Sequence, residues 1–348
     1  MQLTQPLFRW QNWEQFKQGE LQVAQAESTF AAAGQDLIVR VAQAYFDILN
    51  AGDNLEFVKA NKAAISEQLA QAKRNFEVGT ATITDTNEAQ ARFDLAVAQE
   101  IAAVNDLEVK RRALQLLIGD VPPGLKPLRP KVELDVPAPN NMDEWVTRAQ
   151  EQNFNVQAQE AVFEISKREV NRQRAGHLPT LDLVTDYSEN TNQNVATAAL
   201  APRRQIDQAR IGVQLNVPLF AGGAVVSRTR EAVALQEKAR NDLENVRRAA
   251  QLDARRSFLN VSNGLAQVRA LEQALVSSET SLQSNRVGYE VGVRINLDVL
   301  NAVQQVFSTK RDLAKARYDT IINGFRLKQA AGNLTEEDVQ RANALLLP

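Results

Sequence analysis

The residue types that most often carry out enzyme chemistry are scarce in this chain. Its 348 residues include one histidine, His177, and no cysteine. Thiol catalysis, disulfide bonds and cysteine-based metal sites are therefore excluded, and His177 has no second histidine with which to bind a metal ion. The sequence also contains no clustered nucleophile, acid pair or phosphate-binding loop. We expect no catalytic residue, no metal site and no cofactor.

Charge and composition point to long helices instead of a compact enzyme. The 40 basic and 42 acidic residues are spread evenly and give a net charge of -2, so no basic face favours a nucleic acid as a partner. Aromatic residues make up 6% of the chain, which suits helices packed closely through small side chains. No run of about 18 apolar residues is present, so no transmembrane helix is expected.

Polar side chains gather in a stretch that occurs twice. Tyr289-Glu-Val-Gly-Val-Arg-Ile-Asn-Leu-Asp298 repeats the pattern of Phe76-Glu-Val-Gly-Thr-Ala-Thr-Ile-Thr-Asp85, 213 residues earlier. The same offset aligns residues 115–119 with 328–332, so the chain is an internal duplication. Each copy has a glycine after a long apolar-periodic segment and a Thr, Asn or Asp before the next, which are stop and start signals for helices. We interpret each copy as the turn of a helical hairpin.

The elements that must position these turns are very long helices. Residues 10–78 and 224–291 each give roughly 65 to 70 residues of helical pattern, or about 100 Å. The second run has coiled-coil spacing, whereas the first is interrupted by Lys62. Shorter helices return over residues 85–118 and 298–331. The residues that recur every seven positions are Val261, Val268, Leu275, Leu282 and Tyr289, and in the first run Ile48, Leu55, Lys62, Leu69 and Phe76.

The region between the repeats contains alternating strands. A helix is expected over residues 143–175, followed by strands at 178–188 and 210–220, with a polar loop at 190–208 between them. Each strand has about the length that a tilted membrane strand needs. At the end of the chain, Thr335 and Asp338 have the spacing of a capping box that opens a short helix.

The expected order of segments follows from these patterns. We predict a first strand remnant, a first hairpin, a linker, a helix leading to the strands, a strand hairpin with an external loop, a second hairpin and a final helix. Their limits are residues 1–8, 9–118, 119–142, 143–177, 178–220, 221–332 and 333–348.

This duplicated plan resembles the TolC-like outer-membrane channel proteins, which serve as outer-membrane efflux and type I secretion components. The resemblance covers nearly the whole chain, and four motifs carry it: Gly176-His-Leu-Pro-Thr-Leu-Asp-Leu183, Val217-Pro-Leu-Phe-Ala-Gly-Gly223, Tyr289 to Leu300, and Ala316-Arg-Tyr318. It implies a mainly α fold with a small β part. Antiparallel coiled-coil hairpins would form an α-barrel in the periplasm, and strands would contribute to a transmembrane β-barrel shared by a homotrimer. His177 would then pack at the membrane interface.

The resemblance also implies the function and the partners. The protein would be a passive exit duct in the outer membrane of a Gram-negative bacterium, in contact with outer-membrane lipid. A periplasmic adaptor and an inner-membrane pump, either ABC-type or proton-driven, would dock at its hairpin tips. The family has a further helix and strand before the segment that begins here at Gln2. We therefore expect this chain to be N-terminally truncated, with about three strands, too few for its share of a normal barrel.

Position by position, the resemblance carries over a gate latch. Tyr289 and Arg294 match the latch on one hairpin, and Thr84 and Asp85 match their partners on the other. Arg317 matches a second latch arginine, which meets the backbone near Gly79. An Arg fork and a Tyr hydroxyl on one carboxylate would hold the hairpins together strongly yet breakably. The plainer interpretation is that Arg294 is a solvated turn residue and Tyr289 a coiled-coil seam residue.

Asp298 matches a position at which threefold symmetry forms a carboxylate ring at the narrowest point, which favours cations. The second acidic position of the family is Asn301 here, so a trimer would carry three ring charges instead of six. Asp298 as a helix N-cap is the alternative.

Two other classes of function compete with the duct. A soluble coiled-coil scaffold or periplasmic adaptor would use the same hairpins as a docking arm, but it has no use for the alternating strands. An enzyme is the third alternative, and the sequence offers no catalytic cluster for it.

Overall fold

The structure is a computed structural model, and it describes residues 1–120, 124–129, 132, 134–192 and 204–347. The chain divides into two compact units, each made from two stretches. The first contains Met1–Phe30 and Phe154–Arg248, and the second Ala31–Asn153 and Ala249–Pro348. Each unit therefore contains parts of both halves of the duplication. The seven segments expected from the sequence describe the order of elements along the chain, and their limits stay a prediction.

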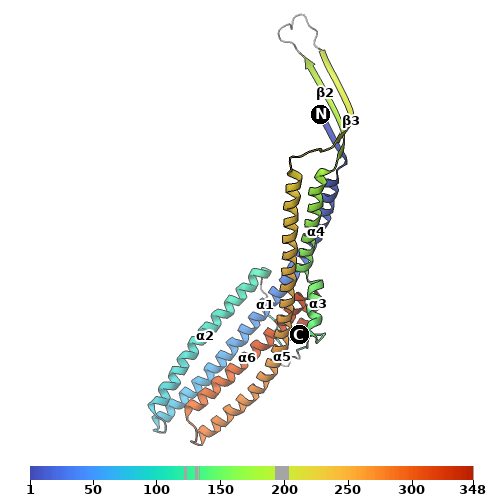
Figure 1. Ribbon diagram of the computed structural model, residues 1–348. Helices are drawn as coiled ribbons and strands as arrows, with labels where there is room; N and C mark the ends of the chain where they lie inside the picture. The colour runs from blue at the N-terminus through green and yellow to red at the C-terminus, as the bar shows by residue number, and fades with distance from the viewer. Residues whose placement is uncertain (121–123, 130–131, 133, 193–203, 348) are drawn as a thin grey trace. The chain divides into compact units, whose positions relative to one another are not determined.

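The first unit carries a three-stranded antiparallel sheet in the order β1-β2-β3 (Figure 1). β2 and β3 pair along their whole length, from Thr180 opposite Asn216 to Asn192 opposite Arg204. The shorter β1 pairs with β2 on its other side. The strands are β1 (Gln2–Phe8), β2 (Thr180–Asn192) and β3 (Arg204–Asn216).

Both long strands differ from the predicted ranges of 178–188 and 210–220. β2 continues to Asn192 and β3 begins at Arg204 because a paired ribbon satisfies its backbone groups whatever its side chains, whereas the prediction followed apolar alternation. β3 ends at Asn216, two residues before Pro218, which has no N–H to donate to a ladder. Residues 193–203 of the predicted loop lie outside the described residues.

A charged pair joins the sheet of the first unit to its helices. Arg9 precedes α1 (Trp10–Glu77), and its guanidinium donates two hydrogen bonds, of 2.9 and 2.8 Å, to the carboxylate of Asp182 in β2. Asp182 is buried, so this bidentate pair satisfies a carboxylate that would otherwise be costly to bury. The other helices of this unit are α4 (Phe154–Arg174), the short η1 (Ala175–His177) and the first part of α5 (Ala224–Glu290).

A polar network joins α1 to α4 in the first unit. The Gln18 amide donates to Oε2 of Glu169 at 3.0 Å, and Glu169 also accepts from Arg172 at 2.7 Å and from Gln173 at 2.6 Å. The hydrogen bond from Arg172 is the main cause that lowers the pKa of Glu169 to about 2, and the two glutamine amides add to it against the opposing effect of burial. Glu169 is therefore held ionised between the two helices.

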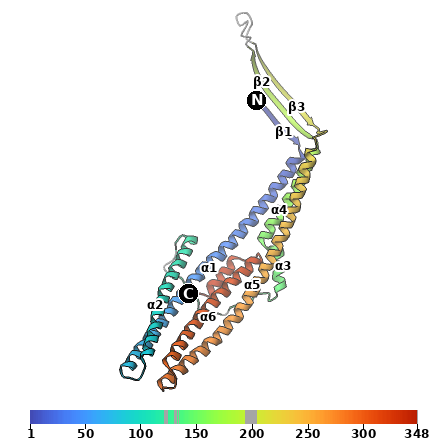
Figure 2. The same ribbon diagram turned by 60° about the vertical axis from the view of Figure 1, so that its left-hand side comes forward.

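The second unit contains two helical hairpins that lie side by side, with their turns at the same end (Figures 1 and 2). The rest of α1 returns through α2, and the rest of α5 returns through α6. Both returning helices begin two residues earlier than predicted. The helices that belong to this unit alone are α2 (Ile83–Ile118), α3 (Met142–Gln152), α6 (Asn296–Ala330) and α7 (Glu336–Ala344).

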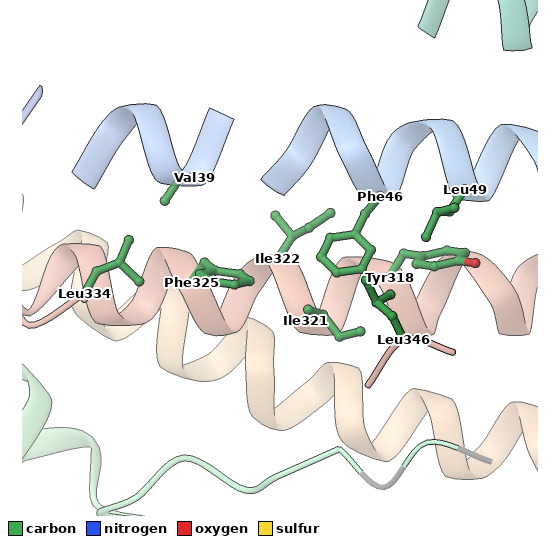
Figure 3. Close-up of a cluster of buried hydrophobic side chains, with 9 residues drawn as sticks. All are labelled: Val39, Phe46, Leu49, Tyr318, Ile321, Ile322, Phe325, Leu334 and Leu346. Carbon is green, nitrogen blue, oxygen red and sulfur yellow. The ribbon is translucent and has the colours of Figure 1, made fainter. Parts of the chain in front are cut away.

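The largest apolar cluster holds the two hairpins together (Figure 3). Its side chains come from α1, from α6 and from the end of the chain. Within it, the Tyr318 hydroxyl donates to Asp53 of α1 at 2.7 Å. Burial, together with this hydrogen bond, raises the pKa of Tyr318. The buried members are Val39, Phe46, Leu49, Tyr318, Ile321, Ile322, Phe325, Leu334 and Leu346.

The predicted coiled-coil seam is confirmed where the helices of the second unit pack. Val261, Leu265 and Val268 of α5 are buried in clusters with α6. In the first hairpin, Lys62 interrupts the apolar stripe but pairs with Glu100 of α2 at 2.6 Å. The lysine therefore contributes to the packing of α1 against α2.

One predicted helix is two helices in the structure. We expected a continuous helix over 143–175, but α3 ends at Gln152, and Asn153 has extended backbone angles before α4 begins. Asn153 is buried, and its amide donates to the carbonyl oxygen of Ala330 at 2.9 Å. The break is caused by this contact with the end of α6, which the helical pattern of residues 143–175 does not reveal.

The predicted capping box at the start of α7 is confirmed. Asp338 accepts the backbone N–H of Thr335 at 3.1 Å and is also paired with Lys328 and Arg341. The box therefore ties the last helix to α6.

Across the described part of the chain, we find no helix whose length and apolar character would let it span a membrane.

Candidate functional site

The two duplicated turns have the same backbone conformation. Gly79 and Gly292 both have φ of 78°, a value that glycine adopts without the strain that a side chain would cause. In the first turn, the carbonyl of Asn75 accepts the N–H groups of the residues at positions 80 and 81, at 2.8 and 3.2 Å. In the second turn, the carbonyl of Gly288 accepts from positions 293 and 294 in the same way, at 2.9 and 3.0 Å. The duplication therefore extends to individual hydrogen bonds.

The helices that follow the turns are capped differently. Thr82 and Asp85 form a capping box, in which Oδ2 of Asp85 accepts from the Thr82 hydroxyl at 2.7 Å and from the Thr82 N–H at 3.0 Å. In the second copy the N-cap is Ile295, which has no side-chain acceptor. Asp298 lies in the first turn of α6, so the interpretation of Asp298 as the N-cap is wrong. Its carboxylate lies 3.6 Å from Arg294 instead.

A cleft of about 380 Å³ lies between the two tips, and the residues that line it come from both turns. Three of the predicted latch residues, Asp85, Tyr289 and Arg294, line it together. One side-chain hydrogen bond spans the hairpins here, from Nδ2 of Asn75 to the Tyr289 hydroxyl at 3.0 Å. The cleft therefore gathers an arginine, a tyrosine and a carboxylate from two hairpins within one chain.

The structure places the other predicted latch residues elsewhere. Thr84 is exposed in the first turn of α2, and Gly79 is at the turn itself. Arg317 lies further along α6, where its guanidinium pairs with Glu272 of α5 at 2.7 Å. The expected contact between Arg317 and the backbone near Gly79 stays a prediction.

Asn301, at the second predicted ring position, takes part in a polar contact between the hairpins. Arg92 of α2 donates to Oδ1 of Asn301 at 3.1 Å and to Gln304 at 2.8 Å. A basic side chain therefore lies next to the position where the family pattern has an acid. Asp298 is one helical turn away and is half-exposed.

Among the cleft residues that sequence reasoning missed, two asparagines stand out by their polar contacts or burial. Asn75 was not among the candidates, although it precedes the repeated stretch directly and aligns with Gly288 in the second copy. Asn296 is buried against the cleft, and its Nδ2 has no hydrogen-bond partner among the described residues. Extending the alignment of the two copies by one residue would have found Asn75. No signal in the sequence singles out Asn296.

The single histidine of the chain does not lie in a cluster of possible metal ligands among the described residues. His177 is exposed at the end of η1. Within the described ranges, no group of three or more His, Cys, Asp or Glu side chains could hold a metal ion.

Comparison with known families gives a match to the family described as outer membrane efflux protein, over residues 1–120 and 145–333. The chain is 36% identical over 343 residues to the outer membrane protein TolC of Vibrio cholerae, which covers 98% of this chain and 78% of the relative. It is 33% identical over 345 residues to the alkaline protease secretion protein AprF of Pseudomonas aeruginosa, which covers 98% of this chain and 70% of that protein.

Solved structures with the same fold include the outer membrane protein VceC of Vibrio cholerae. The TM-score is 0.81 at 18% sequence identity, and the match covers 95% of this chain and 78% of VceC. The Campylobacter jejuni CmeC outer membrane channel also gives a TM-score of 0.81, at 16% identity, over 99% of this chain and 73% of CmeC. At these identities the likeness concerns the fold, and it confirms the predicted fold class of long helical hairpins with a small β part.

Proposed function

Because the chain belongs to the outer membrane efflux protein family, it is a passive outer-membrane exit duct, and we propose that its two hairpin tips gate the periplasmic end of that duct. Related proteins are named as outer-membrane and protease secretion proteins, so the duct serves efflux or type I secretion. The competing interpretation as a soluble scaffold or adaptor loses its support, because these relatives are channels.

One observation carries the gating proposal: Asp85, Tyr289 and Arg294 line the same cleft of about 380 Å³ between the tips. An arginine fork and a phenolic hydroxyl are strong partners for a carboxylate, and each such hydrogen bond contributes about 1.5 to 3 kcal/mol. A latch of this kind resists thermal opening but yields to a docking partner, which makes the tips suitable as a switch.

The family relation extends the proposal to the assembly. The chain would form a homotrimer, and its tips would meet a periplasmic adaptor and an inner-membrane pump. Thr84 would face the same contact as Asp85, and Arg317 would hold the backbone near Gly79 as a second latch. In the trimer, Asp298 would face its symmetry copies, and their carboxylates would favour the passage of cations.

Single-channel recordings of the trimer, reconstituted in planar lipid bilayers from the full-length protein, test the gate. We expect Arg294→Ala combined with Tyr289→Phe to raise the open fraction by about tenfold or more, since about 1.4 kcal/mol of lost stabilisation corresponds to a tenfold change. Arg240→Ala is the matched control, because Arg240 pairs only locally with Glu237 on the exposed surface of α5. An open fraction that stays at the level of the control in the double variant would contradict a gate at this site.

A further inference from the structure

We propose that Asn75 is an additional gate residue, which ties the turn of the first hairpin to the second hairpin through the Tyr289 hydroxyl. This inference rests on the proposed gate and names a residue that the latch pattern carried over from the family does not include. The argument has three parts: the backbone of Asn75, its side chain and the residue at its duplicated position.

The backbone of Asn75 closes the first turn. Its carbonyl oxygen accepts the N–H groups of Thr80 at 2.8 Å and Ala81 at 3.2 Å, and also the Thr80 hydroxyl at 3.1 Å. The carbonyl therefore determines the path of the chain between α1 and α2. Any shift of Asn75 along α1 has to change these bonds and the turn with them.

The side chain of the same residue reaches the other hairpin. Its Nδ2 lies 3.0 Å from the oxygen of Tyr289, and both residues are half-buried. The amide is the donor, so the phenolic oxygen accepts, and its own proton remains available for a carboxylate. Accepting one hydrogen bond strengthens the hydroxyl as a donor for the next.

Two carboxylates line the same cleft, and Asp85 is the one that faces Tyr289 from the other hairpin, whereas Glu290 is the next residue of the same helix. Thr82 donates two hydrogen bonds to Asp85, and Oδ2 accepts both of them. Oδ1 is left as the acceptor for the Tyr289 hydroxyl. The chain of donors in the closed gate would then run from Asn75 through Tyr289 to Asp85. Asn75 is a positioning residue in this chain, because it acts on the latch through Tyr289.

The duplicated position shows that the side chain of Asn75 is a specialisation. Gly288 has the same backbone role in the second turn but no side chain. A Cβ atom at Gly288 would lie 2.7 Å from Cγ of Arg294, closer than real contacts allow. One copy therefore has a side chain that crosses to the other hairpin, and the other copy leaves that space to the latch arginine.

Single-channel recordings of the trimer with Asn75→Ala test the inference. Loss of one neutral hydrogen bond corresponds to an increase of about fivefold in the open fraction. Because Asn75 acts through Tyr289, the double variant with Tyr289→Phe should open no more than Tyr289→Phe alone. Asn285→Ala is the matched control, since it makes the same substitution inside a helix, and Asn285 donates only to Ser281 of its own helix α5. The control should leave the open fraction unchanged.

The outcomes separate the inference from the proposed gate. If Asn75→Ala behaves as the unmodified channel while the Arg294 and Tyr289 variants open it, Asn75 is no gate residue and the gate stands. If the effects of Asn75→Ala and Tyr289→Phe simply multiply, Asn75 does not act through Tyr289, and the inference is wrong. If none of these variants opens the channel, the gate proposal itself fails. Alanine is a strong helix former, so we expect Asn75→Ala to fold. The yield of trimer and its melting temperature verify this.

Discussion

Arg294 owes its position to a glycine six residues earlier in the chain. Gly288 lies near the end of α5, and the side chain of Arg294 packs directly against it. A Cβ atom added at Gly288 would lie 3.3 Å from Cβ and 2.7 Å from Cγ of Arg294. These atoms are close to the arginine backbone, so a rotation about the far bonds of the side chain would not relieve the clash. The glycine therefore sets the direction of the guanidinium towards the cleft.

Gly288→Ala should open the channel without removing any polar group. The new methyl group displaces Arg294 from the end of α5, and we expect an increase in open fraction in the same direction as Arg294→Ala, with the same single-channel measurement. Gly52→Ala is the matched control, because Gly52 lies inside α1 with nothing within 4 Å of its Cβ position. Closed channels with Gly288→Ala would show that Arg294 reaches its partners from another position.

At the scale of the elements, the end of α6 depends on a close approach of two backbones. Gly332 follows the helix with φ of 74°, and a Cβ atom there would lie 2.1 Å from the carbonyl oxygen of Gln152. That carbonyl belongs to the end of α3, beside the break at Asn153. The contact that interrupts the predicted helix therefore also requires a glycine opposite it.

Gly332→Ala should destabilise the second unit severely, by more than about 3 kcal/mol, because strained backbone and a backbone clash act together. Gly324→Ala, inside α6 with open space around its Cβ position, should instead stabilise the protein by about 0.5 to 1 kcal/mol. Urea unfolding of both variants measures the difference. Equal stability of the two variants would contradict the close contact between α3 and the end of α6.

The polar network between α1 and α4 should make the stability of the first unit depend on pH. The pKa of Glu169 is lowered from 4.5 to about 2, so its ionised form stabilises the fold above pH 4.5, and this contribution is lost as the pH falls towards 2. Glu169→Gln should lower the melting temperature at pH 7 and remove this part of the loss between pH 4.5 and 2. Glu164→Gln, whose exposed partner Lys167 lies on the same helix, is the control and should have little effect.

Much of this arrangement of elements follows from the sequence. The seven-residue spacing predicts buried seam residues such as Val261 and Val268, and the repeated glycines predict both hairpin turns. The break at Asn153 could not be predicted, because it depends on a hydrogen bond to Ala330, far away in the chain. The latch candidates Asp85, Tyr289 and Arg294 were named from a family resemblance, whereas the hydrogen bond from Asn75 to Tyr289 is seen only once the two hairpins are placed together.

At the scale of the whole molecule, each charged residue that faces the axis of the proposed trimer would occur three times and form a ring of charges. Asn301→Asp would add a second carboxylate to each protomer, but Arg92 lies 3.1 Å from this position and would neutralise part of the new charge. A carboxylate at position 301 would therefore be paired with an arginine of the same chain, and its charge would contribute less to a ring. A single acidic ring at Asp298 should be blocked less by polyvalent cations than a double ring.

Block of the channel current by a trivalent cation complex measures this effect. We expect Asp298→Ala to abolish most of the block, Asn301→Asp to strengthen it, and Asn301→Asp with Arg92→Gln to strengthen it further. Asn285→Asp adds the same charge on α5, where Asn285 donates only to Ser281 of its own helix, and it serves as the control. Block that is indifferent to Asp298→Ala would refute the ring.

The different residues at positions 75 and 288 also constrain how the gene can evolve. A recombination event that copied the first tip over the second would replace Arg294 by alanine, the residue at position 81, and so remove the latch arginine. The reverse event would remove the only described side-chain hydrogen bond between the two turns. Each event damages the gate at once, so selection should oppose any exchange of sequence between the tips. Neither tip can therefore replace the other without loss of the gate, even though both turns keep the same backbone.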